Sequence, residues 1–180
     1  IVVVLPEEYI AMWKNLAARF DIAVHRCVAG GKERFDSVKR GLEALSPDVE
    51  YVAVHDGVRA LLSKRLVIRT MLDCEKHGAS IPVVEVVDSY RKVVGDSSEI
   101  VPRSELRIVQ TPQTFRADIL RQAYEQEYSA TFTDDASVVE ALGHRISLVE
   151  GELSNIKLTT PEDMEWAEWW LQHREQGGNR

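Results

Sequence analysis

The chain has 180 residues, enough for one domain with a single well-formed hydrophobic core, and we expect residues 1–180 to form one such domain. A composition of 44% hydrophobic and 28% charged residues is typical of a soluble globular protein, and no apolar run approaches the length of a membrane span. The formal charge of −7 argues against a broad nucleic-acid surface, and two cysteines exclude a disulfide framework and favour a reducing, cytoplasmic location.

Strands and helices alternate through the first part of the chain. Residues 1–5 and 22–28 are apolar and predict strands, whereas residues 7–19 between them carry apolar side chains at helical spacing. A strand, a helix and a second strand form a βαβ unit, which implies parallel pairing and a right-handed crossover.

A glycine pair, Gly30 and Gly31, follows the second strand and leads into a helix that stops before Pro47. Glycines at a strand end let the backbone approach a ligand, and the free N–H groups of the helix start favour an anion or a base edge. Ser37 is either the helix cap or a ligand contact. A plain turn before a capped helix explains the same residues, and the segment is neither a Walker loop nor a G-x-G-x-x-G fingerprint.

Residues 51–55 read as a strand covered on both faces, and Asp56 and Arg59 lie in the loop after its carboxyl end. In open α/β sheets the crevice beyond those ends is the usual ligand site. An acid and a base three residues apart, with Gly57 between them, suit a metal, a hydroxyl and a phosphate together. A capped turn beside a solvated charge explains these residues as well, and taken alone they favour that simpler interpretation.

A helix follows from Ser63, its expected N-cap, to about His77, and Gly78 ends it before a strand at residues 79–87. Its expected inward-facing residues are Leu66, Met71 and Leu72. The repeated β/α alternation predicts a three-layer α/β/α sandwich with a mostly parallel, Rossmann-like sheet.

The pattern changes at residues 88–107, where two short extended pieces flank Gly95-Asp96-Ser97-Ser98. A lone two-stranded hairpin is marginally stable in water, so this one must pack against something. We expect a β-arm that packs against a second copy of the chain, in preference to a hairpin that lies on its own domain.

The last third of the chain returns to alternating elements. Residues 108–115 leave a strand through a proline turn and enter a helix to about Tyr128, and residues 133–137 open a short helix with aspartates in its first turn. A strand at residues 145–149 precedes an extended piece that carries Lys157.

The final helix begins at Thr160-Pro161 and runs to about His173, followed by a frayed end at residues 177–180. The side chains expected on its packed face are Met164, Ala167, Trp170 and Leu171. We interpret the tryptophans as packing residues.

The polar residues exclude several mechanisms. No nucleophile sits in an elbow context, and Cys74 and His77 have metal-like spacing without a second pair. The remaining loop residues suit a nucleotide and a phosphorylated small molecule, with a hard cation held by oxygen ligands. They are the glycine pair, Ser37, Asp56, Arg59, Arg103 and Lys157. Nucleotidyl transfer and binding without chemistry both fit this set.

Five motifs together resemble those of the 2-C-methyl-D-erythritol 4-phosphate cytidylyltransferase family of the non-mevalonate isoprenoid pathway. They are Gly30-Gly31-x-x-Arg34-x-x-Ser37-Val38, Val54-His55-Asp56-x-x-Arg59, Gln110-Thr111-Pro112-Gln113-x-Phe115, Thr133-Asp134-Asp135-Ala136-Ser137 and Asn155-Ile156-Lys157-x-Thr159-x-Pro161-Glu162-Asp163. The match spans nearly the whole chain, and five motifs in register are hard to obtain by chance.

The resemblance implies that CTP and 2-C-methyl-D-erythritol 4-phosphate react to give 4-diphosphocytidyl-2-C-methyl-D-erythritol and pyrophosphate, with Mg²⁺ assisting. The substrate phosphate would attack the α-phosphorus in line, without a covalent enzyme intermediate. Asp56 would lie between the ribose, the metal and the polyol hydroxyls. Lys157 would neutralise charge between the reacting phosphates, and Arg103 would complete the catalytic set.

The resemblance also implies binding roles. The residues that would hold the cytidine moiety are Gly31, Lys32 and Ser37. Arg59 would brace the acidic loop or the substrate, and Thr111 would support the site. The residues that would reach the methylerythritol phosphate of a neighbouring subunit are Ser89, Arg103 and Thr133. A homodimer through the arm at residues 88–107 follows.

Three departures from the family pattern bear on activity. The family begins with a strand and a glycine-rich loop that grips the triphosphate, and the chain starts after that point, at Ile1. If the chain is the whole molecule, we expect it to be catalytically dead or nearly so; if it is the ordered part of a longer one, the enzyme is restored. Ala60 replaces a usual proline, and Ser89 replaces a usual threonine but keeps the hydroxyl.

Three other functions compete with this one. Ribitol-5-phosphate cytidylyltransferases share the fold, CTP and most motifs, although residues 134–140 resemble the methylerythritol branch better. A non-catalytic module that binds nucleotide or only dimerises is the second. A nucleotide-sugar-binding protein is the third, but the single Asp56 does not supply the acidic pair that it needs.

Overall fold

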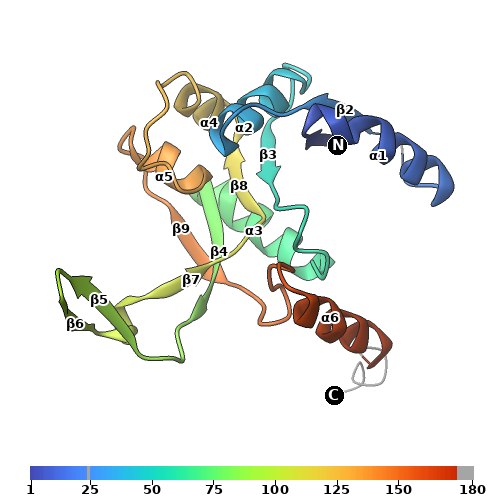
Figure 1. The fold of residues 1–180 in the computed structure, drawn as a ribbon. Coiled ribbons are helices and arrows are strands. Elements are labelled where there is room, and N and C mark those ends of the chain that lie inside the picture. Colours follow the sequence, from blue (N-terminus) through green and yellow to red (C-terminus); the bar gives the residue numbers. More distant parts are fainter. Residues whose placement is uncertain (24, 174–180) are drawn as a thin grey trace. The chain divides into compact units, whose positions relative to one another are not determined.

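The computed structural model describes residues 1–23 and 25–173. Helices and strands alternate along the chain, which confirms the α/β class predicted from the sequence (Figure 1). None of the helices in these two ranges is long and apolar enough to cross a membrane.

The chain folds into two compact units. The first consists of Ile1–Val54 and Phe115–Ile146, and the second of His55–Thr114 and Ser147–Arg180. The single domain expected over residues 1–180 stays a prediction.

The first unit opens with the predicted βαβ arrangement. Strands β1 (Val2–Leu5) and β2 (Arg26–Ala29) pair in parallel, and helix α1 (Glu7–Arg19) connects them. Helix α1 has the bounds that its apolar spacing predicts. Strand β2 is shorter than the predicted strand at residues 22–28.

Four further elements complete the first unit. Helix α2 (Arg34–Glu43) follows β2, and β3 (Tyr51–Val54) follows α2. Helices α4 (Ala117–Ala123) and α5 (Asp135–Glu140) come later in the chain. The predicted helix start at residues 133–137 is confirmed, because the Asp134 side chain accepts a hydrogen bond from the Ser137 N–H as the N-cap.

Aromatic side chains pack together in the core of the first unit. The Phe35 ring on α2 stacks on Tyr124, with 4.7 Å between the ring centroids. Phe132 and Tyr128 approach the same ring at 5.7 and 5.9 Å. Phe35 and Tyr124 are buried, so these rings join α2 to the segment that runs from α4 to α5.

Helix α3 (Lys64–His77) belongs to the second unit and has the predicted ends. The Ser63 Oγ accepts from the Leu66 N–H at 3.0 Å, and Gly78 adopts a left-handed φ of 83°. The expected inward position of Leu72 is wrong, because its side chain is 52% exposed. The residues on the buried face are Leu66, Thr70 and Cys74.

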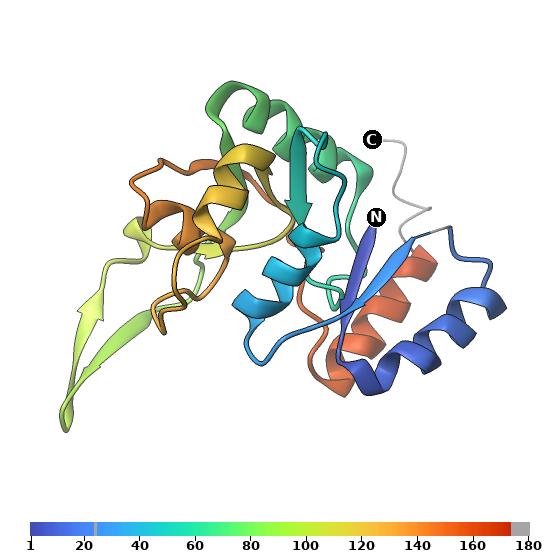
Figure 2. The same ribbon diagram turned by 90° about the horizontal axis from the view of Figure 1, so that it is seen from above.

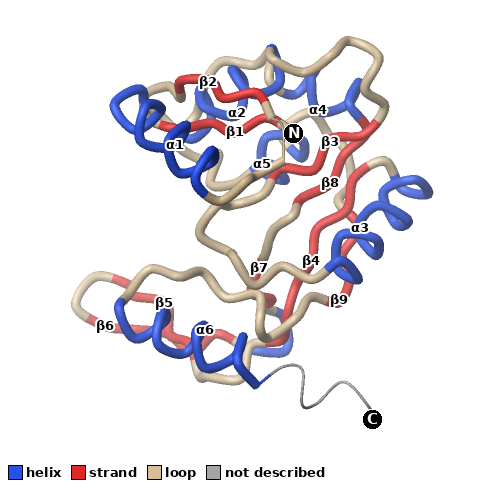
Figure 3. The backbone as a smooth tube through the Cα atoms, turned by 90° about the vertical axis from the view of Figure 1, so that its right-hand side faces the viewer, coloured by secondary structure: helices blue, strands red, loops and turns tan. Residues whose placement is uncertain are grey.

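The sheet of the second unit is built around β4 (Ala79–Glu85). Strand β9 (Ser147–Glu150) pairs with β4 in parallel, and β7 (Arg107–Val109) pairs with it antiparallel. Helix α3 packs against β4 and β9 (Figure 3). Parallel pairing of β4 with a distant strand agrees with the sheet type predicted from the β/α alternation.

Strand β8 (Gln113–Arg116) lies beside β4 in strand order. The helix predicted after the proline turn at residues 108–115, to about Tyr128, is too long, because this strand precedes it. The helix after the strand, α4, has only seven residues. The Gln113 and Thr114 side chains are fully buried although they are polar. A buried strand is usually recognised from apolar residues, so the sequence pattern did not indicate this one.

The predicted hairpin is present as β5 (Tyr90–Val94) and β6 (Ser97–Val101), paired antiparallel. Gly95 at its tip has a φ of 56°, which a glycine adopts without strain. The hairpin forms a sheet of its own that extends away from β4, β7 and β9 (Figures 1 and 2). A short 3₁₀ turn, η1 (Arg103–Glu105), follows it.

Helix α6 (Pro161–His173) has the predicted bounds, and the predicted frayed end at residues 177–180 lies outside the described residues. Its packed face is narrower than predicted, because Ala167 is buried whereas Met164 and Leu171 are 50% and 45% exposed.

Candidate active site

A tight turn after β3 presents Asp56, the acid that the sequence singles out. The Arg59 N–H donates to the Asp56 carbonyl oxygen at 2.9 Å, which closes the turn over Gly57 and Val58. The Asp56 N–H donates to the Thr111 Oγ1 at 3.0 Å. This hydrogen bond is consistent with the predicted supporting role of Thr111, because its hydroxyl holds the backbone of Asp56.

Asp56 meets Lys157 although the two residues are far apart in the sequence. The Lys157 Nζ lies 3.2 Å from the Asp56 Oδ2, and the Arg59 Nε lies 3.7 Å from the same oxygen. One carboxylate between two cations leaves a net positive charge, which favours an anionic ligand. The Lys157 side chain is 52% exposed, so its ammonium group is accessible to a ligand.

Lys157 lies on a segment without regular secondary structure, held by buried amide side chains. The Gln110 Nε2 donates to the Glu152 carbonyl at 2.8 Å, and its Oε1 accepts from the Glu152 N–H at 3.1 Å. The Asn155 Nδ2 donates to the Thr111 carbonyl at 2.8 Å. Next to Lys157, the Leu158 N–H donates to the Val58 carbonyl at 2.9 Å. These bonds fix the segment against the acidic turn.

Arg59 braces the site through backbone atoms. Its Nη1 donates to the Asn155 carbonyl at 2.7 Å, and its Nη2 donates to the Val109 carbonyl at 3.4 Å. Burial lowers the pKa of the Arg59 guanidinium, and the charge of Asp56 acts in the opposite direction. Of the two roles predicted for Arg59, its contacts match the brace of the acidic loop.

His55 lies in the site as well, although its residue type and position did not predict a role for it. Its Nδ1 lies 2.9 Å from the Thr111 Oγ1, and its Nε2 lies 3.2 Å from the Arg59 carbonyl oxygen. Burial lowers the pKa of His55, which favours the neutral imidazole. The available signal was its place as the first polar residue after an apolar strand.

The glycine turn of the first unit holds Ser37 tightly. The Gly31 N–H donates to the Ser37 Oγ at 3.0 Å, and that hydroxyl donates to the Glu33 carbonyl at 3.1 Å. A Cβ at Gly31 would lie 2.1 Å from the Asp36 Cβ, so only glycine fits there. Ser37 is not the helix cap, because α2 begins earlier, with Glu33 as its N-cap. Lys32, in the same turn, is exposed.

The same unit holds an ion pair between a partly exposed guanidinium and a buried carboxylate, which lies close to Thr133 in the sequence. The Arg34 guanidinium donates to both Asp135 carboxylate oxygens, at 3.1 and 2.7 Å. The Tyr124 hydroxyl donates to the Asp135 Oδ1 at 2.6 Å, and burial together with this charge raises the pKa of Tyr124. Asp135 is fully buried, whereas Thr133 is exposed. Arg34 and Asp135 belong to two of the family-like motifs, but no pairing between them was predicted from the sequence.

The two arm residues lie at its base. Ser89 precedes β5 and is exposed. Arg103 begins η1, is exposed, and donates from its Nη1 to the Val87 carbonyl at 2.6 Å. This bond crosses the base of the arm and holds the Arg103 guanidinium against the backbone of Val87.

The structure thus gathers four predicted site residues of the second unit around one turn: Asp56, Arg59, Thr111 and Lys157. In the first unit, Gly31, Lys32 and Ser37 share one turn. Within residues 1–23 and 25–173, no group of three or more histidine, cysteine, aspartate or glutamate side chains is placed so that it could hold a metal ion. A lone carboxylate fits Mg²⁺, which binds through one or two carboxylates plus phosphates and water, and does not fit a structural zinc site.

Known proteins match almost the whole chain. A family model described as 2-C-methyl-D-erythritol 4-phosphate cytidylyltransferase matches residues 1–173. A relative of that name from Bacteroides fragilis is 47% identical over 169 residues, which are 93% of this chain and 76% of the relative. Another, from Alkaliphilus oremlandii, is 42% identical over 159 residues, which are 86% of this chain and 67% of the relative.

Solved structures agree with the sequence matches. The crystal structure of a 4-diphosphocytidyl-2C-methyl-D-erythritol synthase from Anaerococcus prevotii superposes with a TM-score of 0.84 at 32% identity, covering 96% of this chain and 81% of that one. A 2-C-methyl-D-erythritol 4-phosphate cytidylyltransferase from Thermus thermophilus superposes with a TM-score of 0.75 at 31% identity, covering 96% and 98%.

Proposed function

We propose, from the premise that the chain belongs to the 2-C-methyl-D-erythritol 4-phosphate cytidylyltransferase family, that it joins CTP and 2-C-methyl-D-erythritol 4-phosphate. The products are 4-diphosphocytidyl-2-C-methyl-D-erythritol and pyrophosphate. The observation that carries the proposal is the contact between Asp56 and Lys157, residues of two separate family motifs. The same family assignment favours this reaction over the three alternatives, which are ribitol-5-phosphate cytidylyl transfer, a non-catalytic binding module and nucleotide-sugar binding.

The reaction forms one phosphorus–oxygen bond and breaks another. An oxygen of the methylerythritol phosphate attacks the α-phosphorus of CTP, and the bond to the β-phosphate breaks as pyrophosphate leaves. Such transfers depend on positioning and charge neutralisation more than on covalent chemistry. Lys157, with its half-exposed ammonium, would neutralise charge between the two phosphates.

Asp56 would hold Mg²⁺ through a carboxylate oxygen and orient the ribose and polyol hydroxyls. The ion supplies positive charge to the triphosphate when bound. Thr111 and Arg59 keep the turn that carries this carboxylate in place, through the Asp56 N–H and the Asn155 carbonyl.

The remaining predicted residues would bind substrates. The cytidine group would lie at the glycine turn, on Gly31, Lys32 and Ser37. Because the Ser37 hydroxyl already bonds to the Gly31 N–H and the Glu33 carbonyl, we expect it to shape the turn as well as to meet the base. We place the enzyme in the cytoplasm, where CTP is available.

We propose a homodimer built through the arm at residues 88–107. Every residue of β5 is exposed, and Val93 and Ile100 are 77% and 76% exposed, which is a large apolar surface for a hairpin in water. A second copy that covers the arm would bring Ser89, Arg103 and Thr133 to the methylerythritol phosphate of its neighbour.

The test is pyrophosphate release by the full-length protein with CTP, Mg²⁺ and either methylerythritol 4-phosphate or ribitol 5-phosphate. We expect release with the first substrate alone, and we expect EDTA to abolish it. Release with ribitol 5-phosphate alone would instead assign the rival branch. No release with either, from protein that still binds CTP, would support the non-catalytic reading.

A further inference from the structure

His55 lies at the junction between β3 and the acidic turn and contacts both ends of that turn. Its Nδ1 meets the Thr111 hydroxyl, which accepts the N–H of Asp56, the first residue of the turn. Its Nε2 meets the carbonyl oxygen of Arg59, the last residue of the turn.

The chemistry of the partners fixes the direction of each hydrogen bond. A carbonyl oxygen only accepts, so the His55 Nε2 must carry a proton and donate it to the Arg59 oxygen. In the neutral ring the Nδ1 is then an acceptor, and the Thr111 hydroxyl supplies its single proton to it. The Thr111 oxygen keeps lone pairs for the Asp56 N–H. Each donor in this series of three hydrogen bonds therefore has an acceptor when His55 is the Nε2-protonated tautomer.

The turn that His55 contacts at both ends also anchors the segment that carries Lys157. The Val58 carbonyl, inside the turn, accepts from the Leu158 N–H, directly after Lys157. The Asp56 carboxylate and the backbone next to Lys157 are therefore both held by this turn. The 3.2 Å separation of these two side chains depends on it.

We propose that His55 is a positioning residue for cytidylyl transfer, which clasps the turn at Asp56–Arg59 as its Nε2-protonated tautomer through Thr111 and the Arg59 carbonyl. The proposal rests on the proposed function, because it gives His55 a task in that reaction. His55 itself need not touch either substrate. Residues that orient reactive groups in this way typically change activity by about 10- to 100-fold when removed.

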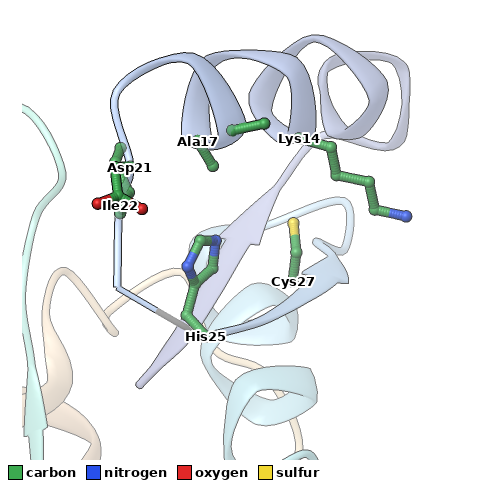
Figure 4. A pocket seen from close by; sticks show the side chains of 7 residues that line it. Lys14, Ala17, Asp21, Ile22, His25 and Cys27 are labelled. Carbon is green, nitrogen blue, oxygen red and sulfur yellow. The ribbon is translucent and has the colours of Figure 1, made fainter.

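The first test compares His55→Phe with a matched control, His25→Phe. His25 is also half-buried with two hydrogen bonds, since it accepts from the Trp13 Nε1 at 2.7 Å and bonds the Ala23 carbonyl through its Nδ1 at 2.8 Å. Its side chain lines a pocket beside α1, together with Cys27 and Lys14 (Figure 4). Both variants keep an aromatic ring and lose two hydrogen bonds. Only His55→Phe removes bonds to the turn at Asp56–Arg59.

We expect His55→Phe to lower kcat by about 10- to 100-fold, with less than a threefold change in the KM for CTP. His25→Phe should keep wild-type kcat at a temperature where both proteins are folded. His55→Asn, which retains an acceptor for the Thr111 hydroxyl, should recover part of the loss. Equal kcat values for wild type and His55→Phe, or equal losses in the two Phe variants, would refute the proposal.

The second test measures the tautomer in the unaltered protein by ¹⁵N-histidine NMR. We expect His55 to carry its proton on Nε2, and His25 to carry its proton on Nδ1, because the Ala23 carbonyl accepts there. The two histidines then serve as opposite internal references. A proton on the Nδ1 of neutral His55 would overturn the proposal even if His55→Phe failed to fold.

The two levels of inference fail in different ways. If the wild-type protein released no pyrophosphate but His55 showed the Nε2-protonated tautomer, the proposed function would fall while the hydrogen-bond assignment stood. If the wild type were active and His55→Phe kept full kcat, the positioning role would fall while the function stood.

Discussion

The two cations beside Asp56 differ in what else they touch. The Arg59 guanidinium donates to two backbone carbonyls, and the side chain is only 11% exposed, so Arg59 stabilises the turn. Lys157 is half-exposed and lies on the solvent side of the same carboxylate. The residue that a ligand can recruit is therefore Lys157, and the residue that keeps the carboxylate in place is Arg59.

Lys157→Ala should lower turnover by about a hundred- to a thousand-fold, the usual cost of removing one charge-stabilising donor. The free energy of unfolding should change by less than about 1 kcal/mol, because exposed ion pairs contribute little. Pyrophosphate release and urea denaturation measure the two effects. Near-normal turnover would contradict a catalytic role for Lys157.

The Arg34–Asp135 pair offers a second residue-level prediction, this time about stability. Arg34→Met would leave the fully buried Asp135 carboxylate with the Tyr124 hydroxyl but without its guanidinium. We expect the free energy of unfolding to fall by about 3 kcal/mol, the lower end for breaking a buried pair, because Arg34 is itself 39% exposed.

The control for that variant is the exposed Arg116–Asp118 pair, whose side chains are 54% and 63% exposed. Arg116→Met should cost no more than about 1 kcal/mol in urea denaturation. Similar losses in the two variants would show that burial of the Asp135 carboxylate does not set the cost.

At the scale of elements, the loop after β9 is held as firmly as a strand would be. Gln110 makes a two-bond clamp on Glu152, and Gly151 donates to the Val83 carbonyl at 2.8 Å. A methyl group at Gly151 would lie 2.5 Å from the Gln110 Oε1. The loop therefore accepts only glycine where it passes Gln110.

Gly151→Ala should push the clamp apart and move the segment that carries Lys157. We expect a loss of about 1–3 kcal/mol in the free energy of unfolding, as for other overpacked sites, and a drop in kcat of about tenfold or more. Gly143→Ala is the control, because Gly143 has a φ of 83° in open space, and an alanine there costs roughly 1–2 kcal/mol without touching the site. An equal drop in kcat for both variants would exclude a specific role of the clamp.

Elements whose packing follows a simple period were predictable from the sequence. Helices α1 and α6 have the expected bounds because apolar spacing and a proline start mark them. Strand β8 was not predictable, because its buried Gln113 and Thr114 take their partners from other parts of the chain, such as Thr70, whose Oγ1 accepts from the Thr114 Oγ1 at 3.1 Å.

The candidate site was predictable to a similar degree. The charged residues of the second unit followed from their motifs, but the role of His55 depends on bonds to Thr111 and to a backbone oxygen. Spacing in the sequence carries no information about either bond. Of the two roles that the sequence left open for Ser37, the helix cap is wrong, because its hydroxyl bonds to Gly31 and Glu33 within the turn, and the ligand contact stays a prediction.

For the molecule as a whole, the exposed arm determines whether the proposed active site is complete within one copy. Arg103 is exposed at the base of the arm, and its bond to Val87 fixes the direction in which it can reach. If a second copy covers the arm, each site would take Lys157 from one chain and Arg103 from the other.

Mixing two inactive variants tests this arrangement. Lys157→Ala and Arg103→Ala proteins, unfolded and refolded together, should recover up to about a quarter of wild-type activity, because about half of the dimers are mixed and each has one complete site. Separately refolded variants, combined afterwards without exchange, are the control. Recovery no greater than in that control would place Arg103 in the site of its own chain.

Arg103→Ala alone should raise the KM for the polyol phosphate far more than the KM for CTP. Steady-state kinetics with each substrate varied in turn measure both values. Equal changes in the two constants would contradict a contact between Arg103 and the methylerythritol phosphate.

The segment that carries Lys157 is tied down mostly through its own backbone, which predicts an uneven tolerance to mutation along it. The Glu152 amide and carbonyl and the Leu158 amide make anchoring bonds, and the Glu152 carboxylate also accepts from the Ser63 hydroxyl at 2.8 Å. Leu153, 79% exposed, should accept nearly any residue, whereas Gln110 and Asn155 should accept almost none. A saturation library selected for growth would therefore show free variation at Leu153 and strong restriction at Asn155, two residues apart in the same loop.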